Sequence, residues 1–413
     1  MVLAFLSCKS DEPAPPLQSG LFEVNLLWET EVEGREDFAG GFFRSGSNLL
    51  CVRHNSSELH RYFLYFIDEE NGTIEKKVVS DHPIALGYLQ NVHDEIVNNK
   101  IIVKSNDIVH EIDVATGDIA TTEMNRGDAL DGIAIEGEEI YRYKNTVPDE
   151  TDTFHYELSH RRIGTIGEQK LAVVQSGNSP RRLMYLAGEI GDPPFCRQLL
   201  FVEDHYQTTN RIHTYELHAY DVKSKQFTWE MPNIFGYSSL DEDKHLIPLF
   251  LSVVDKNPSD LHGLEKDYLL ATFNKKLICV DLVQKAIKWE RNLTSLRPLQ
   301  FGSRIIVSNS NEIEVLNLKT GEPIYRKSGM YNVGYGYISE NILYFTGSES
   351  VSEDNKLYAV DLASKEIKLV QAGVRLNKTV NGSPNDFLSR VHVIKDNVFV
   401  GDHSHIYCFR LKH

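Results

Sequence analysis

Long apolar runs are absent from this sequence of 413 residues. No stretch reaches the roughly 18 consecutive apolar residues that a membrane-spanning helix needs. Positive charge is scarce, because 43 Lys and Arg stand against 59 Asp and Glu and give a formal net charge of −16. A chain of this charge repels phosphate backbones, so we expect no nucleic acid among its partners. Aromatic residues, by contrast, make up 10% of the chain, and they favour strands over helices.

Cysteine is also rare. The chain has five cysteines, no CxxC motif and no Cys/His spacing typical of a zinc site. We therefore expect no disulfide framework, no metal and no cofactor. Cys51, Cys279 and Cys408 lie inside apolar strand-like runs, which predicts that they are core residues.

Cys8 lies in a different setting. It follows the apolar run "VLAFLS" and precedes the polar, Pro-rich segment "KSDEPAPP". This arrangement resembles the end of a bacterial lipoprotein signal, in which a small residue such as Ser7 precedes the lipidated cysteine. The resemblance implies that residues 1–21 are a signal remnant, a lipidation site and a flexible tether. It also implies a lipid-anchored protein of the bacterial cell envelope, on the periplasmic side or the surface of the outer membrane. An incidental cysteine in a frayed terminus is the alternative.

A repeat organises the rest of the chain. In six segments an Asp or Asn (Asx) ends an alternating apolar run, and Gly or Lys follows four positions later. These residues are Asp68, Asp113, Asp221, Asp281, Asn317 and Asp361. An Asx side chain at the start of a tight turn accepts backbone N–H groups, and a glycine with positive φ closes the turn. A β-rich run lies on either side of each Asx run, and a connecting segment supplies a fourth strand. Each unit is therefore expected to be a four-stranded antiparallel meander.

Two further units depart from this pattern. The third unit, "EEIYRY" with "FHYELSHRRIG", keeps the strand spacing but lacks the Asx residue. The last unit, "NVFVGDHSHIYCFRLKH", has two central strands and then ends. Eight units of about fifty residues are typical of propeller blades. The predicted fold is an all-β, eight-bladed propeller, with seven blades as the alternative because the third unit is degenerate.

The three tryptophans mark one position in the repeat. Trp229 and Trp289 lie eight residues after the Asx of their units, on the third run. Trp28 lies in a matching run, "VNLLWETEV", with no earlier runs before it, and the last unit lacks this run. We therefore predict that residues 22–32 supply the outer strand of the final blade and close the ring. Residues 22–413 would then form a single domain.

The pattern A-x-D-x-x-[ST]-[GK]-x-x-x-W, seen most fully in "AYDVKSKQFTW", resembles the PQQ-like (quinoprotein-type) propeller repeat. With Cys8, the chain is similar to the propeller lipoproteins of bacterial outer-membrane assembly, which are eight-bladed, non-enzymatic scaffolds. The resemblance implies a protein-binding scaffold with a partner in the cell envelope. Quinoprotein dehydrogenases carry adjacent cysteines and a calcium site, and this sequence has neither motif. We expect no enzyme activity.

The segment "GDHSH" places Asp402, His403 and His405 within four positions. Two imidazoles and one carboxylate fall short of the four ligands usual for structural zinc. We interpret the segment as a polar turn between the second and third strands of the last unit.

Long insertions are predicted as loops at 145–154, 203–215 and 254–268. Loops on a rigid scaffold usually carry binding, and the second insertion combines aromatic rings with an arginine, as interface hot spots do. It is the candidate partner-binding loop, with neutral length variation as the alternative. Its residues of interest are His205, Tyr206, Arg211 and His213.

The leading functional prediction is a non-catalytic protein-binding scaffold. The alternative is a glycan- or small-ligand-binding protein, or an enzyme, that uses the central funnel of the propeller. Inner-strand residues would then converge at the axis; examples are Tyr88, His93, Tyr335 and His392.

Overall fold

A computed structural model gives the fold of most of the chain. It describes residues 23–33, 42–45, 48–55, 61–79, 90–91, 96, 98–105, 108–116, 118–123, 132–136, 139–146, 154–176, 183–190, 198–207, 212–221, 224, 226–238, 249–251, 268–273, 276–292, 298–309, 311–334, 336–350, 355–376, 391–401 and 405–412. Every regular element in these ranges is a strand, which confirms the all-β class. Across them no helix is long and apolar enough to cross a membrane. Cys8 and the segment 1–21 lie outside the described residues.

The strands form four-stranded antiparallel sheets, of which the described ranges contain eight. The sheets of the first half are β2 (Phe42–Ser45), β3 (Asn48–Asn55), β4 (Arg61–Asp68) and β5 (Ile74–Val79); β6 (Gln90–Asn91), β7 (Lys100–Ser105), β8 (Ile108–Asp113) and β9 (Ile119–Glu123); β10 (Gly132–Glu136), β11 (Glu139–Thr146), β12 (Phe154–Arg162) and β13 (Gln169–Ser176); and β14 (Leu183–Ile190), β15 (Gln198–Gln207), β16 (Ile212–Asp221) and β17 (Gln226–Ser238).

The second half continues the same pattern. Its sheets are β18 (Leu249–Leu251), β19 (Tyr268–Phe273), β20 (Lys276–Asp281) and β21 (Ala286–Asn292); β22 (Leu299–Phe301), β23 (Arg304–Asn309), β24 (Glu312–Asn317) and β25 (Pro323–Ser328); β26 (Tyr337–Ser339), β27 (Ile342–Gly347), β28 (Asn355–Asp361) and β29 (Ile367–Leu376); and β30 (His392–Ile394), β31 (Asn397–Gly401), β32 (His405–Lys412) and β1 (Glu23–Glu31).

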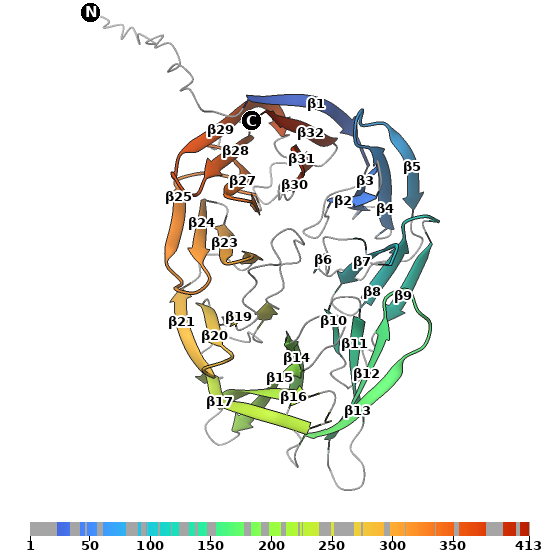
Figure 1. Cartoon of the computed structure of the whole chain (residues 1–413), viewed down its shortest axis with the longest axis vertical. Coiled ribbons are helices and arrows are strands. Elements are labelled where there is room, and N and C mark those ends of the chain that lie inside the picture. Colours follow the sequence, from blue (N-terminus) through green and yellow to red (C-terminus); the bar gives the residue numbers. More distant parts are fainter. Residues whose placement is uncertain are drawn as a thin grey trace, which may run out of the picture.

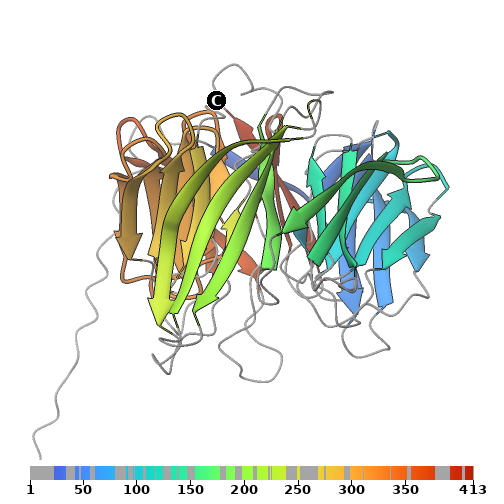
Figure 2. The same ribbon diagram turned by 90° about the horizontal axis from the view of Figure 1, so that it is seen from below.

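The sheets follow one another around a common centre (Figure 1). The first strand of each sheet lies nearest the centre and the fourth lies at the periphery. In the turned view the strands run through the thickness of the molecule (Figure 2). The last sheet has the order β1-β32-β31-β30, so the N-terminal strand occupies the outer position next to the C-terminal strand.

The core lies between neighbouring sheets. One apolar cluster joins Phe63 and Tyr65 of β4 to Phe399 of β31 and Ile406 of β32. A second cluster joins sheet β18–β21 to sheet β22–β25, and a third spans the last three sheets. Because a middle strand is covered on both faces, it is continuously apolar, as in "KLICVD" of β20.

Cys51, Cys279 and Cys408 are fully buried, which confirms their predicted place in the core. Burial raises the pKa of the Cys279 thiol and of the Cys408 thiol to about 12, so both remain protonated at neutral pH. A protonated, enclosed thiol is a poor nucleophile. These two cysteines therefore act as packing residues.

Candidate functional site

The repeated Asx residues organise the turn between the third and fourth strands of their sheets. The Oδ1 atom of Asn317 accepts the backbone N–H groups of Lys319 at 2.8 Å and Thr320 at 3.1 Å. The same pair of bonds is present at Asp68, Asp113, Asp281 and Asp361, and Asp221 accepts the N–H of Ser224. The fourth residue after the Asx has a positive φ at Gly72, Lys285, Gly321 and Lys365. The repeat thus encodes one turn geometry, in which glycine or lysine occupies the left-handed position.

Trp289 of β21 links its own sheet to the next one. Its indole N–H donates to the carbonyl of Leu318, the residue after Asn317, at 2.8 Å. Its ring lies on Gly321, where a Cβ atom would be 2.6 Å from Cδ2 of the indole. Arg291, two residues further along β21, donates to the carbonyl of Gly321 at 2.7 Å. The tryptophan therefore binds the Asx turn of the following sheet.

Trp28 of β1 makes the same contacts with sheet β2–β5. Its indole N–H donates to the carbonyl of Glu69 at 2.9 Å, and its ring lies on Gly72. Thr30 donates its hydroxyl to the carbonyl of Gly72 at 2.6 Å. Asn397 of β31 also reaches Glu69, through its amide, at 3.1 Å. The N-terminal strand and the C-terminal strands are thus bonded to the same turn of the first sheet.

At two other junctions between sheets, lysine side chains take part in the contact with the Asx turn. The Nζ of Lys285 lies 5.2 Å from the ring of Trp229, so a cation contacts the indole where glycine lies under it in the other two turns. Lys76 lies eight residues after Asp68, at the tryptophan position. It donates to the carbonyl of Thr116 at 3.0 Å, in the Asx turn of sheet β6–β9.

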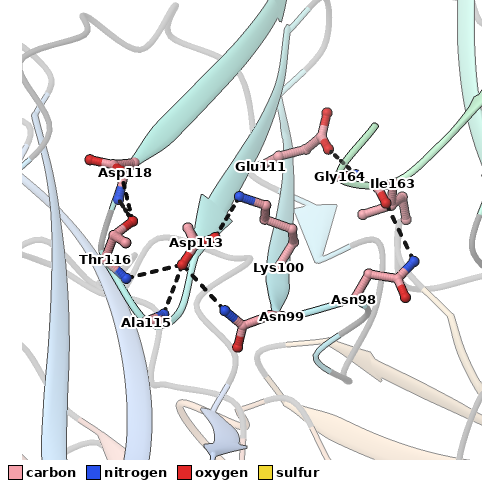
Figure 3. Close-up of polar contacts among 10 residues, drawn as sticks. All are labelled: Asn98, Asn99, Lys100, Glu111, Asp113, Ala115, Thr116, Asp118, Ile163 and Gly164. Carbon is pink, nitrogen blue, oxygen red and sulfur yellow. Dashed lines mark hydrogen bonds and ion pairs between the residues drawn. The ribbon is translucent and has the colours of Figure 1, made fainter. Parts of the chain in front are cut away.

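The junction between sheets β6–β9 and β10–β13 is polar (Figure 3). Thr121 occupies the tryptophan position of β9, and it bonds to His110 of its own sheet at 2.9 Å. The turn of the degenerate unit has no Asx carboxylate. Glu111 of β8 supplies one instead, because its Oε2 accepts the backbone N–H of Gly164 at 2.9 Å. Its other oxygen pairs with Arg161, and the two side chains are only 4% and 10% exposed.

At the same junction a side chain also bonds to the first carbonyl of the turn, the one that accepts an indole N–H at Glu69 and Leu318. Asn98 donates its side-chain amide to the carbonyl of Ile163 at 3.3 Å (Figure 3). Sequence reasoning missed both Glu111 and Asn98. The one available signal was the missing Asx in the third unit, which leaves its turn N–H in need of another acceptor.

Asp113 forms a second ion pair in this region. Its Oδ2 accepts from the ammonium of Lys100 at 2.7 Å (Figure 3). This hydrogen bond, with those from the backbone N–H groups of Thr116 and Ala115, lowers the pKa of Asp113 to about 2. The carboxylate is therefore ionised throughout the neutral range.

Aromatic rings of the inner strands pack against one another. His392 of β30 lies 4.8 Å from the ring of Tyr337 of β26 and 6.5 Å from Phe42 of β2, measured between ring centroids. Tyr337 meets Phe301 of β22 edge to face at 5.1 Å. All four side chains are at most 7% exposed, so these contacts join inner strands of neighbouring sheets. Tyr88, His93 and Tyr335 lie outside the described residues.

The prediction of a loop at 203–215 was wrong. Strands β15 and β16 continue through this segment as a hairpin of ten cross-strand pairs, up to Gln207 opposite Ile212. The corresponding hairpins of the other sheets have five to eight described pairs. Figure 2 shows the long yellow-green strands of this sheet.

The candidate partner-binding residues are distributed over this hairpin. His205 and Tyr206 lie on β15, and His213 lies on β16 opposite Tyr206. Arg211 and the side chains of the other three lie outside the described part of the chain. The flanking strand β17 also extends, since Phe235 pairs with Tyr215 and Ser238 with Ile212.

No group of three or more His, Cys, Asp or Glu side chains suited to a metal ion occurs within the described ranges. In the last sheet, β31 ends at Gly401 and β32 begins at His405, so the segment "GDHSH" does connect the second and third strands. The Nε2 atom of His405 lies 3.6 Å from the Oε1 atom of Glu29 on β1. Asp402 and His403 lie outside the described residues.

Comparisons with known proteins identify the fold. No protein-family model and no curated protein matches the chain. The chain is similar to the crystal structure of Saccharomyces cerevisiae Sqt1, at 9% identity and a TM-score of 0.50, over 93% of this chain and 98% of that one. It is also similar to a europium-containing methanol dehydrogenase, at 9% identity and a TM-score of 0.50, over 94% of this chain and 93% of that one. Both are β-propellers, so the likeness shows that this chain has an all-β propeller fold.

Proposed function

We propose that this protein is a non-catalytic propeller scaffold that binds a protein partner through the β15–β16 hairpin. The observation that carries the proposal is the length of that hairpin. Its ten pairs extend beyond the five to eight of the other sheets. Paired backbone that continues beyond the usual length of a sheet offers an ordered surface for recognition.

We also propose that the eight sheets are the blades of one ring, closed by residues 22–32. The pairing of β1 with β32 and the bonds of Trp28 and Thr30 to sheet β2–β5 support this arrangement. Deletion of residues 22–32 is then expected to lower the melting temperature strongly. Deletion of residues 1–21 is expected to leave it unchanged. Equal melting temperatures for the two truncated chains would refute closure by this strand.

The proposed location is the bacterial cell envelope, with a lipid anchor on Cys8. The proposal rests on the sequence "VLAFLSCKS", in which Ser7 precedes the cysteine, and on the Pro-rich tether that follows. The tether would hold the ring away from the bilayer. The partner is therefore sought among envelope proteins.

The alternative of a ligand site or an enzyme centre at the propeller funnel has less support. The inner-strand rings of Phe42, Tyr337 and His392 are buried against one another, which is a packing arrangement. The methanol dehydrogenase neighbour is an enzyme, and its likeness to this chain concerns the fold alone.

The test is capture of the partner from native membranes by crosslinking, followed by mass spectrometry. In one variant, an Asn-Gly turn replaces residues 204–215, so that the directly opposed pair Glu203 and Glu216 closes a two-residue hairpin. In the matched control, the same turn replaces 144–157 between Tyr143 and Leu158 of β11 and β12. We expect a defined envelope protein to be lost with the first variant and retained with the second. Loss with both variants, or with neither, would contradict the proposal.

A further inference from the structure

Strand β17 is the outer edge of the sheet that carries the long hairpin. At 13 residues it is the longest strand of the described chain. Its first part contacts the next sheet, since Trp229 lies under Lys285. Pro232 then interrupts the edge, because proline has no N–H to donate. The part that remains for another strand is Phe235–Ser238, which follows the bulge and pairs with β16 on its inner side.

Charged side chains, lysine above all, are one of the features that keep outer strands of soluble sheets from pairing edge to edge, and prolines and bulges are others. Five outer strands carry Lys or Arg, namely β5 with Lys76 and Lys77, β13 with Lys170, β21 with Lys288 and Arg291, β25 with Arg326 and Lys327, and β29 with Lys368 and Arg375. Strand β17 has no Lys or Arg, and Glu230 is its one charged residue. The other two outer strands without Lys or Arg are β9, which has five residues, and β1, which carries three glutamates.

The charge of the chain determines what kind of strand this edge suits. A formal net charge of −16 disfavours a second copy of the chain or an acidic segment. The negative charge of the chain attracts a basic segment, and β17 has no Lys or Arg that would repel it. Backbone pairing supplies affinity for any extended chain, and the alternate side chains supply the selectivity.

We propose that the outer edge of β17 at Phe235–Ser238 binds an extended, basic segment of a partner protein, which adds a fifth strand to sheet β14–β17. The inference rests on the proposed function, in which this sheet is the partner-binding sheet, and it specifies the binding mode and the chemistry of the partner.

The experiment uses the full chain and a fluorescein-labelled peptide of alternating lysine and valine, with a glutamate–valine peptide as its counterpart. The edge variant is Gly236→Lys with Ser238→Lys. The matched control is Ala120→Lys with Thr122→Lys on the outer strand β9, which adds the same charge. We expect the basic peptide to bind the wild-type chain, to lose at least about tenfold in affinity on the edge variant, and to lose less than about twofold on the control.

Hydrogen exchange on the wild-type chain provides a measurement that does not depend on the variants. The basic peptide should protect amides within 235–238. Protection elsewhere, an equal loss of affinity in both variants, or equal binding of the acidic peptide would overturn the proposal. Self-association of the chain through this edge in sedimentation would also overturn it. If the native partner is lost with the shortened hairpin but retained by the edge variant, the scaffold proposal stands and strand addition is rejected.

Discussion

Replacement of Gly321 by alanine tests whether the tryptophan contact holds neighbouring sheets together. Gly321 has a φ of 68°, and an alanine Cβ would lie 2.6 Å from Cδ2 of Trp289. The indole must therefore move. Gly329 has a similar φ of 74°, and a Cβ added there would have no neighbouring atom within 4 Å. Gly329→Ala therefore carries the same backbone strain without the collision.

The expected difference follows from what the indole would lose. The left-handed conformation costs about 1 kcal/mol for alanine at either position. At Gly321 the displaced ring also loses the 2.8 Å hydrogen bond to Leu318, worth about 1 kcal/mol, and part of its buried surface, worth about 1.5 kcal/mol. We expect a loss of about 3 kcal/mol or more in the free energy of unfolding for Gly321→Ala, and about 1 kcal/mol for Gly329→Ala.

Urea unfolding followed by far-ultraviolet circular dichroism measures both variants, because the strand signal does not depend on the tryptophan. A shift in midpoint at constant slope reports stability alone. If the two variants are destabilised equally, the contact between Trp289 and the Asx turn does not stabilise the junction between the two sheets, and the reasoning is refuted.

Three further predictions concern single side chains. Glu111→Gln removes the carboxylate that pairs with the buried side chain of Arg161 and should lower the free energy of unfolding by about 3 kcal/mol, whereas Glu290→Gln, in an exposed ion pair, should cost less than about 1 kcal/mol in the same urea assay. The pKa of Asp113 is about 2 in the folded chain against 3.8 for the free carboxyl, so its contribution is complete above about pH 4 and is lost as the pH falls toward 2. Lys100→Met should weaken that loss in unfolding curves taken between pH 5 and 2, and an unchanged pH dependence would refute the assignment. Labelled palmitate should be incorporated into the wild-type chain and not into Cys8→Ala; equal labelling would exclude the lipid anchor.

The strands could be predicted from the sequence because local chemistry determines them. An Asx side chain that accepts two backbone N–H groups fixes where one strand ends and the next begins, as at Asn317. The alternating or continuous apolar runs beside it then have no other compatible structure. The degenerate third unit, which lacks the Asx, was recognised from its strand spacing alone.

The long hairpin could not be predicted, because polar residues near the end of a strand resemble a loop. The segment from His205 to His213 contains "QTTNR", which is typical of a turn, and only its cross-strand partners reveal that the flanking residues are paired. Pairing of this kind depends on geometry rather than on composition. The contact of Glu111 with Gly164, 53 residues apart, was hidden for the same reason.

One position, eight residues after the Asx, explains much of the difference between what was predicted and what was missed. A tryptophan is visible in the sequence at this position in Trp289 and on the matching outer strand in Trp28, and both bind the next turn through the indole N–H. Lys76 also binds the next Asx turn, through its ammonium and a different carbonyl, without any resemblance to an aromatic residue. Where Thr121 turns toward its own sheet, the next sheet must be held from another position, and the buried carboxylate of Glu111 meets that need. At Trp28, Lys76 and Trp289 the chain thus keeps a contact with the next turn rather than one residue type, and a sequence pattern records that contact only where tryptophan makes it.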